Sequence, residues 1–528
     1  MGTAQRESLV RMNRSCAYRR LVARIIAIGC LVLGCVTVSV SQIVLRASFI
    51  ARHFSPDGIL EAGTIERIQS LNGISLVAGI ALFLLGGVIL AWRRCRRWIL
   101  PVARFVQRDL HPAFAQDATR SGRPDLPGML ITVVLAAALA SPVLSQAIRA
   151  TDGQKDYQWH IRAAETLASS TEDQRVVLPH FLYQALVVAA KYVIPHLTFS
   201  QAGFLVALLA NGLLGGVLYV WIWPAFRAGG QRTVSVAAIV TSLALLVVTP
   251  ITLFTAARKD LYLGYIGITV YHNPTITLLK PLALFLFLLV PGALKGWAGA
   301  WRRSRTAVLG LLSGICTFAK PSYAICLLPA VAVAGLNRLI RRRTLGWLPV
   351  ILGIGLPSVL VLGWTYLFRY AAGDVVAQKS IAFAPFVVHS HYSGDLLPKF
   401  LLSILFPLYV LIGYWRGARR DAFVVLAWAA FVFGAFYGYL LAEVLPDGRI
   451  ALDANFFWSE QITLFILFVA STRLFIRQER LADRGEKPIA AVSRLYIGAA
   501  VFLLHLASGA LYYFVNLIGQ GRYWWFAR

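Results

Sequence analysis

The chain has 528 residues, of which 58% are hydrophobic and only 14% are charged, and its mean hydropathy is +0.68. A soluble domain is closer to half apolar and a quarter charged, so this composition excludes an ordinary soluble protein. The formal net charge of +28 does not indicate a nucleic-acid partner here, because basic residues beside apolar stretches are the usual cytoplasmic anchors of a membrane protein.

We therefore predict an all-α, polytopic membrane protein with about thirteen spans of about 20 apolar residues each. In chain order these spans are 25–45, 72–92, 128–147, 201–224, 234–255, 274–292, 306–319, 322–340, 346–368, 399–415, 422–442, 459–475 and 495–517. Residues 1–92 contain a two-span hairpin, residues 93–127 form a proline-containing cytoplasmic linker, and residues 128–528 form the remaining membrane body.

The first predicted span, 25–45, follows an arginine-rich segment and precedes no small-residue cleavage pattern. We expect a retained span rather than a signal peptide, with a cytoplasmic N-terminus. The later arginine clusters fall in loops that this topology places in the cytoplasm. Because the number of spans is odd, the C-terminus is then expected outside. The six cysteines fall in predicted spans or cytoplasmic loops, which disfavours a disulfide framework and a zinc site.

The charge alternation also decides two ambiguous segments. Residues 179–194 are apolar but shorter than the roughly 20 residues that a span needs, and a crossing there would move every later arginine cluster outside. We expect this segment to be an interfacial helix on the outer face. Residues 306–340 have arginine clusters at both ends and must cross twice, with a break at Lys320-Pro321 because proline cannot continue the helical hydrogen bonding.

The predicted external loop 148–200 is the most informative segment for function. Asp156 and His160 are four residues apart, so they share one face of a short amphipathic helix. The apolar stripe of that helix consists of Tyr157, Ile161, Ala164 and Ala168. The interfacial helix 179–194 follows, and the chain then re-enters the membrane. The loop therefore places a carboxylate where a lipid head group and an external acceptor can meet.

The pattern Asp156-x-x-x-His160-x-x-Ala163-Ala164 after a span resembles the first-external-loop motif of the C superfamily of glycosyltransferases (GT-C). The stretch that contains His180 and Tyr183 is similar to the second juxtamembrane helix of that family. The resemblance implies a polytopic enzyme that takes sugars from polyprenyl or dolichyl phosphates.

In that family the loop carboxylate acts as catalytic base or metal ligand. The resemblance assigns this role to Asp156, with Asp152 second, and assigns His180 and Tyr183 to the acceptor side or the loop. The spacing of the two aspartates departs from the tight Asp-x-Asp of some families, so a divalent metal such as Mg or Mn stays an open question.

Transfer from a glycosyl phosphate also needs positive charge at the departing phosphate. The candidates at the predicted outer boundary are Arg258, Lys259, Lys280, Lys320 and Arg449. Lys280 and Lys320 stand out because each precedes a proline within apolar sequence, where an unpaired charge is costly. His272 lies in the turn before the Lys280 span and could face the same cavity.

Each candidate also has a structural interpretation. Asp156 could serve only as a helix N-cap, and the two lysines as anchors that extend to the interface. His160 is a candidate catalytic base, but an interfacial packing or hydrogen-bonding role is the expectation. His180 is expected to be structural, and His389 and His391 have no partners at a metal-binding spacing. Three acids flank the external turn 446–460 and could hold an acceptor or a metal, although solvated loop acids are the expectation: Asp447, Asp453 and Glu460.

The leading hypothesis is a GT-C-type glycosyltransferase of the bacterial plasma membrane. It would move a sugar from a polyprenyl-phosphate donor to a glycan, lipid or protein acceptor on the outer face. A transporter or flippase for a lipid-linked or anionic solute is the second hypothesis, although most charges lie at span ends. A polysaccharide polymerase or ligase is the third, and the loop 369–398 is poor in the arginines that such enzymes use.

Overall fold

The computed structural model describes residues 125–149, 155–169, 180–226, 231–252, 264–269, 271–297, 302–367, 380–452, 455–482 and 489–520. These residues all belong to the membrane body, apart from the last few of the linker. The predicted spans 25–45 and 72–92, nearly all of the linker 93–127, and the candidates Asp152, Arg258 and Lys259 lie outside the described residues.

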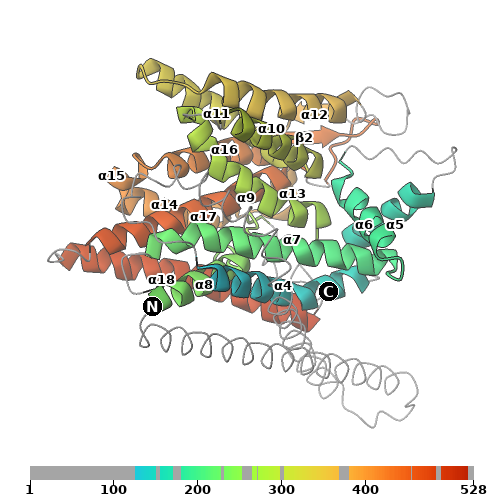
Figure 1. Ribbon diagram of the computed structural model, residues 1–528, viewed down its shortest axis with the longest axis horizontal. Helices are drawn as coiled ribbons and strands as arrows, with labels where there is room; N and C mark the ends of the chain where they lie inside the picture. Colours follow the sequence, from blue (N-terminus) through green and yellow to red (C-terminus); the bar gives the residue numbers. More distant parts are fainter. Residues whose placement is uncertain are drawn as a thin grey trace, which may run out of the picture.

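The described chain is almost entirely helical (Figure 1). The first half contains α4 (Leu126–Arg149), α5 (Lys155–Ser169), α6 (Leu182–Val193), α7 (Phe199–Ile222) with a 3-10 turn (Trp223–Phe226), α8 (Gln231–Val247), α9 (Pro274–Lys295) and α10 (Arg302–Ala319). The second half contains α11 (Ser322–Ile340), a π-helical turn (Pro349–Gly355), α12 (Leu356–Tyr366), β1 (Ser380–Phe383), α13 (Val387–Tyr392), α14 (Leu396–Gly413), α15 (Trp415–Ala418), α16 (Ala422–Leu440), β2 (Leu441–Val444), α17 (Phe457–Ala482), α18 (Ile489–Leu511) and a closing π-helix (Tyr512–Gln520).

Nine helices within the described residues are long and apolar enough to cross a membrane. They are Leu126–Ile148, Phe199–Phe226, Pro274–Lys295, Ser322–Ile340, Pro349–Tyr366, Leu396–Gly413, Ala422–Leu440, Phe457–Glu479 and Ser493–Ile518. The polytopic all-α class is thus confirmed, whereas the count of thirteen spans is not. The two other body spans that we predicted correspond to α8 and α10.

Helix α8 is shorter than the predicted span 234–255 because it ends at Val247, just before Thr249-Pro250. Proline lacks an amide hydrogen and disfavours helix in the residue before it. The backbone after α8 is bonded by a distant helix: Thr249 N donates to the His505 carbonyl at 3.3 Å, and Thr252 N donates to Ser508 Oγ at 3.1 Å. Non-helical backbone is tolerated at membrane depth where the protein buries and bonds it.

Helix α10 begins four residues before the predicted span 306–319, and the added Arg302-Arg-Ser-Arg305 segment lowers its hydropathy. The predicted break between α10 and α11 is confirmed, since α10 ends at Ala319 and α11 begins at Ser322. Lys320 therefore lies at a sharp turn between two helices of the bundle.

The helices pack closely where small residues face each other. On α7, a side chain at Gly215 would collide with the Ala136 side chain of α4 and come within 3.0 Å of the Thr132 carbonyl. Small residues let helix backbones approach closely, which is how membrane helices gain van der Waals contact without a hydrophobic driving force. The α4–α7 pair forms one wall of the bundle and carries α5 and α6 at its end (Figure 1).

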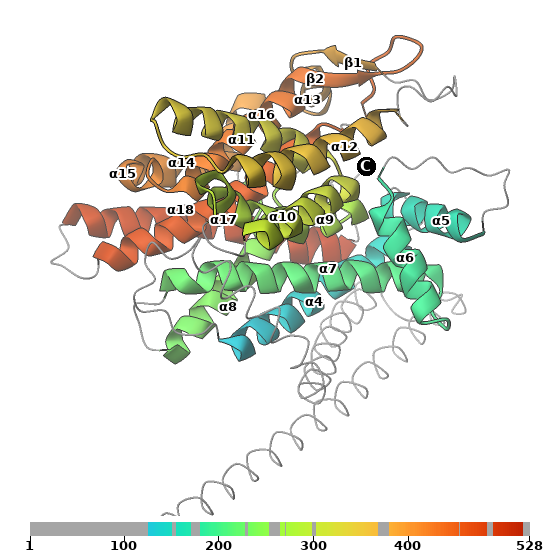
Figure 2. The same ribbon diagram turned by 45° about the horizontal axis from the view of Figure 1, so that its top comes forward.

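The two ends of the bundle differ in composition. We call the end that carries α5, α6, β1, β2 and the α10–α11 turn the loop end, and the end that carries α15 and the arginines after α11 the basic end (Figures 1 and 2). Described arginines at the basic end include Arg338, Arg341, Arg342, Arg343, Arg416, Arg419 and Arg420. This separation is the charge asymmetry on which the predicted topology rests.

At the loop end, β1 and β2 pair antiparallel, with Ser380 opposite Val444 and Phe383 opposite Leu441 (Figure 2). Ala384, Val388 and Ala442 form a small core of their own beneath this ribbon. The ribbon and α13 thus make a compact cap on α16 and α17, separate from the main core.

Candidate functional site

Asp156 lies in the first turn of α5, where its carboxylate accepts a hydrogen bond from Asn273 Nδ2 at 2.9 Å. Asn273 is also the N-cap of α9, because its Oδ1 accepts from the amide of Ile276 at 3.1 Å. A single amide side chain therefore begins one helix and holds the carboxylate of another. The interpretation of Asp156 as an N-cap is wrong, since α5 begins at Lys155.

Lys320 reaches the same place from the α10–α11 turn. Its Nζ donates to Thr275 Oγ1 at 3.1 Å, and Thr275 in turn donates to Asn273 Oδ1 at 2.6 Å. A continuous chain of hydrogen bonds thus joins Lys320, Thr275, Asn273 and Asp156. Lys320 is buried, and its ammonium lies 4.6 Å from the centre of the Trp458 ring, a cation–π distance.

Lys280 lies two turns into α9, where its ammonium donates to the carbonyl of Ile268 at 3.1 Å and stands 5.0 Å from the Phe465 ring. Only 6% of the residue is exposed, so the ammonium does not extend to an interface as an anchor would. The anchor interpretation fails for Lys320 for the same reason.

His272 lies near the charges of Asp156, Lys320 and Lys280, with its ring 5.5 Å from that of Trp458. Burial lowers the pKa of His272, the Asp156 carboxylate raises it, and the ammonium groups of Lys320 and Lys280 lower it. The balance favours the neutral imidazole. We call Asp156, His272, Asn273, Lys280, Lys320 and Trp458 the aspartate–lysine cluster.

His160 lies one turn beyond Asp156 on α5 and is buried against α6, where its Nδ1 is 2.6 Å from Gln184 Nε2. Burial and the positive charge of Lys320 lower the pKa of His160 to about 4, although Asp156 opposes the shift. The ring is therefore neutral near pH 7, with Nδ1 as the acceptor. This geometry supports the positioning and packing interpretation of His160 over that of a base.

The structure thus brings together five of the residues singled out from the sequence: Asp156, His160, His272, Lys280 and Lys320. They come from α5, the α8–α9 loop, α9 and the α10–α11 turn. Two buried ammonium groups, one carboxylate and two neutral imidazoles lie near one another. Such a site is suited to hold an anion next to a group that accepts a proton.

Other candidates lie apart from the cluster. Tyr183 is fully buried in α6 and donates to the Gly203 carbonyl at 3.0 Å, so it fixes α6 to α7; burial raises its pKa well above the ordinary value. His180 lies in the bend before α6. Arg449 lies in the exposed turn after β2 and pairs with Asp447 at 2.6 Å, which lowers the pKa of that carboxyl.

The expectation for Glu460 is wrong. It is not a solvated loop acid, because it lies in the first turn of α17 with its side chain completely buried. Its partner is His389, whose Nε2 is 3.2 Å from Glu460 Oε1. The two residues are 71 positions apart, so no local spacing in the sequence could reveal the pair.

Within the described ranges, no group of three or more His, Cys, Asp or Glu side chains is arranged to hold a metal ion. Asp152, the second acid of the predicted loop motif, lies outside these ranges. The participation of Mg or Mn therefore stays as open as it is from the sequence.

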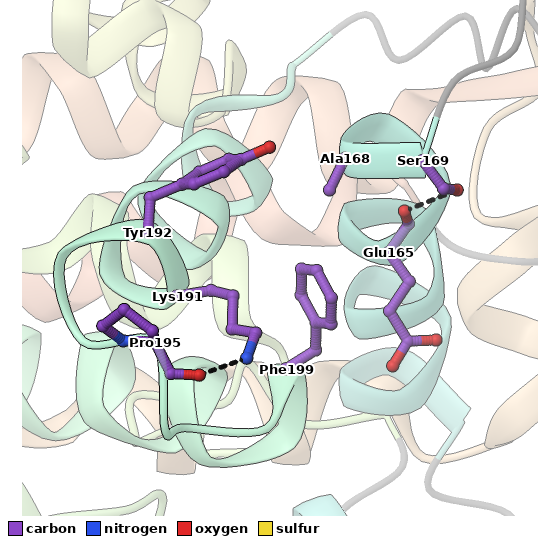
Figure 3. Close-up of a pocket in the computed structure, with 7 residues that line it drawn as sticks. All are labelled: Glu165, Ala168, Ser169, Lys191, Tyr192, Pro195 and Phe199. Atoms are coloured by element: carbon purple, nitrogen blue, oxygen red, sulfur yellow. Dashed lines mark hydrogen bonds between the residues drawn. The ribbon is translucent and has the colours of Figure 1, made fainter.

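A cavity of about 390 Å³ lies between the C-terminal part of α5 and the connection from α6 to α7 (Figure 3). It is lined by Glu165, Ala168, Ser169, Lys191, Tyr192, Pro195 and Phe199. Lys191 Nζ donates to the Pro195 carbonyl at 2.5 Å across its floor. Glu165 lies roughly 13 Å along α5 from Asp156, by the helical rise, so this cavity is distinct from the cluster.

Sequence reasoning missed three members of the site: Asn273, Thr275 and Trp458. A signal for Asn273 existed, because Asn followed by Pro274 is a common start of a helix. Lys399 was also missed, although it is 2% exposed in α14 and its ammonium lies 5.4 Å from the Tyr265 ring. It follows a proline within apolar sequence, which is close to the signal that marked Lys280 and Lys320.

Comparison of the chain with protein-family models and with curated proteins finds no match. The resemblance of the 148–200 loop to GT-C enzymes therefore stays a prediction from the sequence.

Proposed function

We propose that the protein is a membrane glycosyltransferase that moves a sugar from a polyprenyl-phosphate donor to an acceptor hydroxyl. The observation that carries this proposal is the hydrogen-bond chain from Lys320 through Thr275 and Asn273 to Asp156, with Lys280 buried nearby. It sets a cation and a carboxylate at a fixed separation at the loop end of the bundle.

The reaction uses these groups in a simple way. The bond between the anomeric carbon and the donor phosphate oxygen breaks, and the electron pair leaves with polyprenyl phosphate. Lys320 and Lys280 stabilise the negative charge that develops there. A bond forms between the anomeric carbon and the acceptor oxygen, whose proton passes to the Asp156 carboxylate. Trp458 and the neutral His272 offer an aromatic face and a hydrogen-bonding ring beside the sugar.

In this reaction scheme the loop end faces outward from a bacterial plasma membrane. Basic residues concentrate on the cytoplasmic side of membrane proteins, and the described arginine clusters lie at the basic end. Helix α6 has 12 residues, or about 18 Å of helix, which is too short for a hydrocarbon core of about 30 Å. Its exposed Tyr192 and Val193 suit an interfacial position.

A donor-turnover assay tests the proposal. The protein is reconstituted in vesicles with a panel of polyprenyl phosphates that carry radiolabelled sugars, and lipid-linked label, free sugar and transferred sugar are separated. Release of polyprenyl phosphate with sugar transfer or hydrolysis supports the enzyme. Movement of the labelled lipid between leaflets without bond cleavage would instead support the flippase hypothesis.

Asp156→Asn is the matching variant. It keeps the hydrogen bond to Asn273 by amide rotation but removes the base, so we expect a loss of turnover of at least about 100-fold. Glu165→Gln on the same helix makes the same chemical change beside the separate cavity and should leave turnover within about twofold of the unmodified protein. Undiminished turnover in Asp156→Asn would remove this residue from the mechanism.

A further inference from the structure

The cap at the loop end contains a buried pair that the proposed reaction does not use. His389 of α13 and Glu460 of α17 lie 3.2 Å apart, and the side chains of both are fully buried. The His389 ring is stacked between two other rings, with centroid distances of 3.9 Å to Tyr439 and 3.9 Å to Phe457 and interplanar angles of 7° and 19°. Burying an acid costs desolvation free energy, and removal of its partner destabilises the folded protein strongly.

The first turn of α17 connects this pair to the aspartate–lysine cluster. Phe457 and Glu460 are three residues apart and so lie on one face of the helix, toward the cap. Trp458 follows Phe457 by one residue and points about 100° away around the helix. Its ring lies 4.6 Å from the Lys320 ammonium and 5.5 Å from the His272 ring.

The neighbouring helix packs closely on Glu460. A side chain at Gly438 of α16 would collide with the Glu460 carboxylate, so the carboxylate lies directly against the backbone of α16. On the side of the cap, Val388 of α13 packs with Ala384 and Ala442 in the small core, and Phe457 of α17 packs against that core. The first turn of α17 is therefore clamped between α13 and α16.

We propose that the His389–Glu460 pair is a positioning device that holds Trp458 against Lys320 at the donor site. The pair does not touch the reacting atoms. It fixes the rotation of the first turn of α17 and thereby the ring that packs on the phosphate-binding lysine. The effect on donor binding rests on the proposed function, whereas the effect on the position of Trp458 does not.

The test uses the full-length protein in nanodiscs with 5-fluorotryptophan incorporated at position 458. His389→Ala, which lies on a different element from the label, should move the fluorine resonance of residue 458. His389→Gln can still donate to Glu460 and should return the resonance toward its original position. The matched control is Tyr414→Phe, which removes the hydrogen bond to Glu479 at the other end of α17 and should leave the resonance unchanged.

Kinetics give the second readout. In the turnover assay, His389→Ala should raise the KM for the polyprenyl-phosphate donor about tenfold and change kcat by less than about threefold, because a positioning residue for the donor acts on binding. If His389→Ala does not fold, Tyr439→Leu removes one ring of the stack and should give the same pair of effects. An unmoved resonance in a folded variant overturns the proposal. A moved resonance with no turnover in any protein would overturn the proposed function while leaving the positioning role in place.

Discussion

Asn273 shows how one side chain can serve structure and chemistry together. Its carbonyl oxygen begins α9 and its amide nitrogen holds the Asp156 carboxylate. The sequence reveals the first role through the pair Asn273-Pro274, and it marks Asp156 through the loop motif. It does not reveal the bond between them, because the two residues are 117 positions apart. Single candidates were thus predictable, whereas the contacts that make them a site were not.

The buried ring of His160 predicts a pH dependence of stability. Its pKa in the folded protein is about 4, below its value in the unfolded chain of about 6.5. Above pH about 6.5 the ring is neutral in both states and its contribution to stability is complete. As the pH falls from about 6.5 to about 4, only the unfolded chain takes up the proton, so the free energy of unfolding drops, by at most about 3 kcal/mol for this group.

Thermal unfolding in detergent at pH 7.5 and pH 5 measures this loss. His160→Asn keeps an acceptor for Gln184 but has no titrating ring, so its midpoint should fall less between the two pH values than that of the unmodified protein. His272 titrates in the same sense in both proteins, and the difference between them isolates His160. Equal losses in both proteins would show that His160 is not a buried neutral histidine.

At the scale of elements, the sequence predicted helices where local signals are complete. The break at Lys320-Pro321 and the buried stripe of α5 through Tyr157, Ile161 and Ala164 are confirmed. The early end of α8 was missed, although Pro250 signals it, because the buried non-helical backbone that follows is hydrogen-bonded by α18, more than 250 residues later. The hydrophobic periodicity of one segment carries no information about a hydrogen-bond partner that far away in the sequence.

The start of α9 offers a prediction that separates capping from positioning. Asn273→Ser keeps a capping oxygen but is too short to hold Asp156, whereas Asn273→Ala loses both. We expect Asn273→Ala to cost about 1 kcal/mol more in stability than Asn273→Ser, while both lose donor turnover by a similar factor. Unfolding midpoints and turnover of the two variants measure the two effects, and turnover that follows stability alone would argue against a positioning role.

For the whole molecule, the positive residues at one end and the site at the other predict a definite topology. In a cysteine-free background, the Tyr192→Cys variant in α6 and the Arg449→Cys variant should each react with a membrane-impermeant maleimide added outside intact cells. The Arg416→Cys variant in α15 should react only after the membrane is permeabilised. Both outer positions are well exposed in the structure, so a failure to label would not be due to burial. Labelling of Arg416→Cys in intact cells would reverse the proposed orientation.

The position of the donor phosphate tests the proposed site most directly. A cryo-EM structure of the protein in nanodiscs with polyprenyl phosphate should show the phosphate within hydrogen-bond distance, roughly 3 Å, of the ammonium groups of Lys320 and Lys280. Asp156 should face the same space, on the side where an acceptor would enter. A phosphate bound instead at the basic end, or at Arg449, with the aspartate–lysine cluster unchanged, would contradict the proposed site.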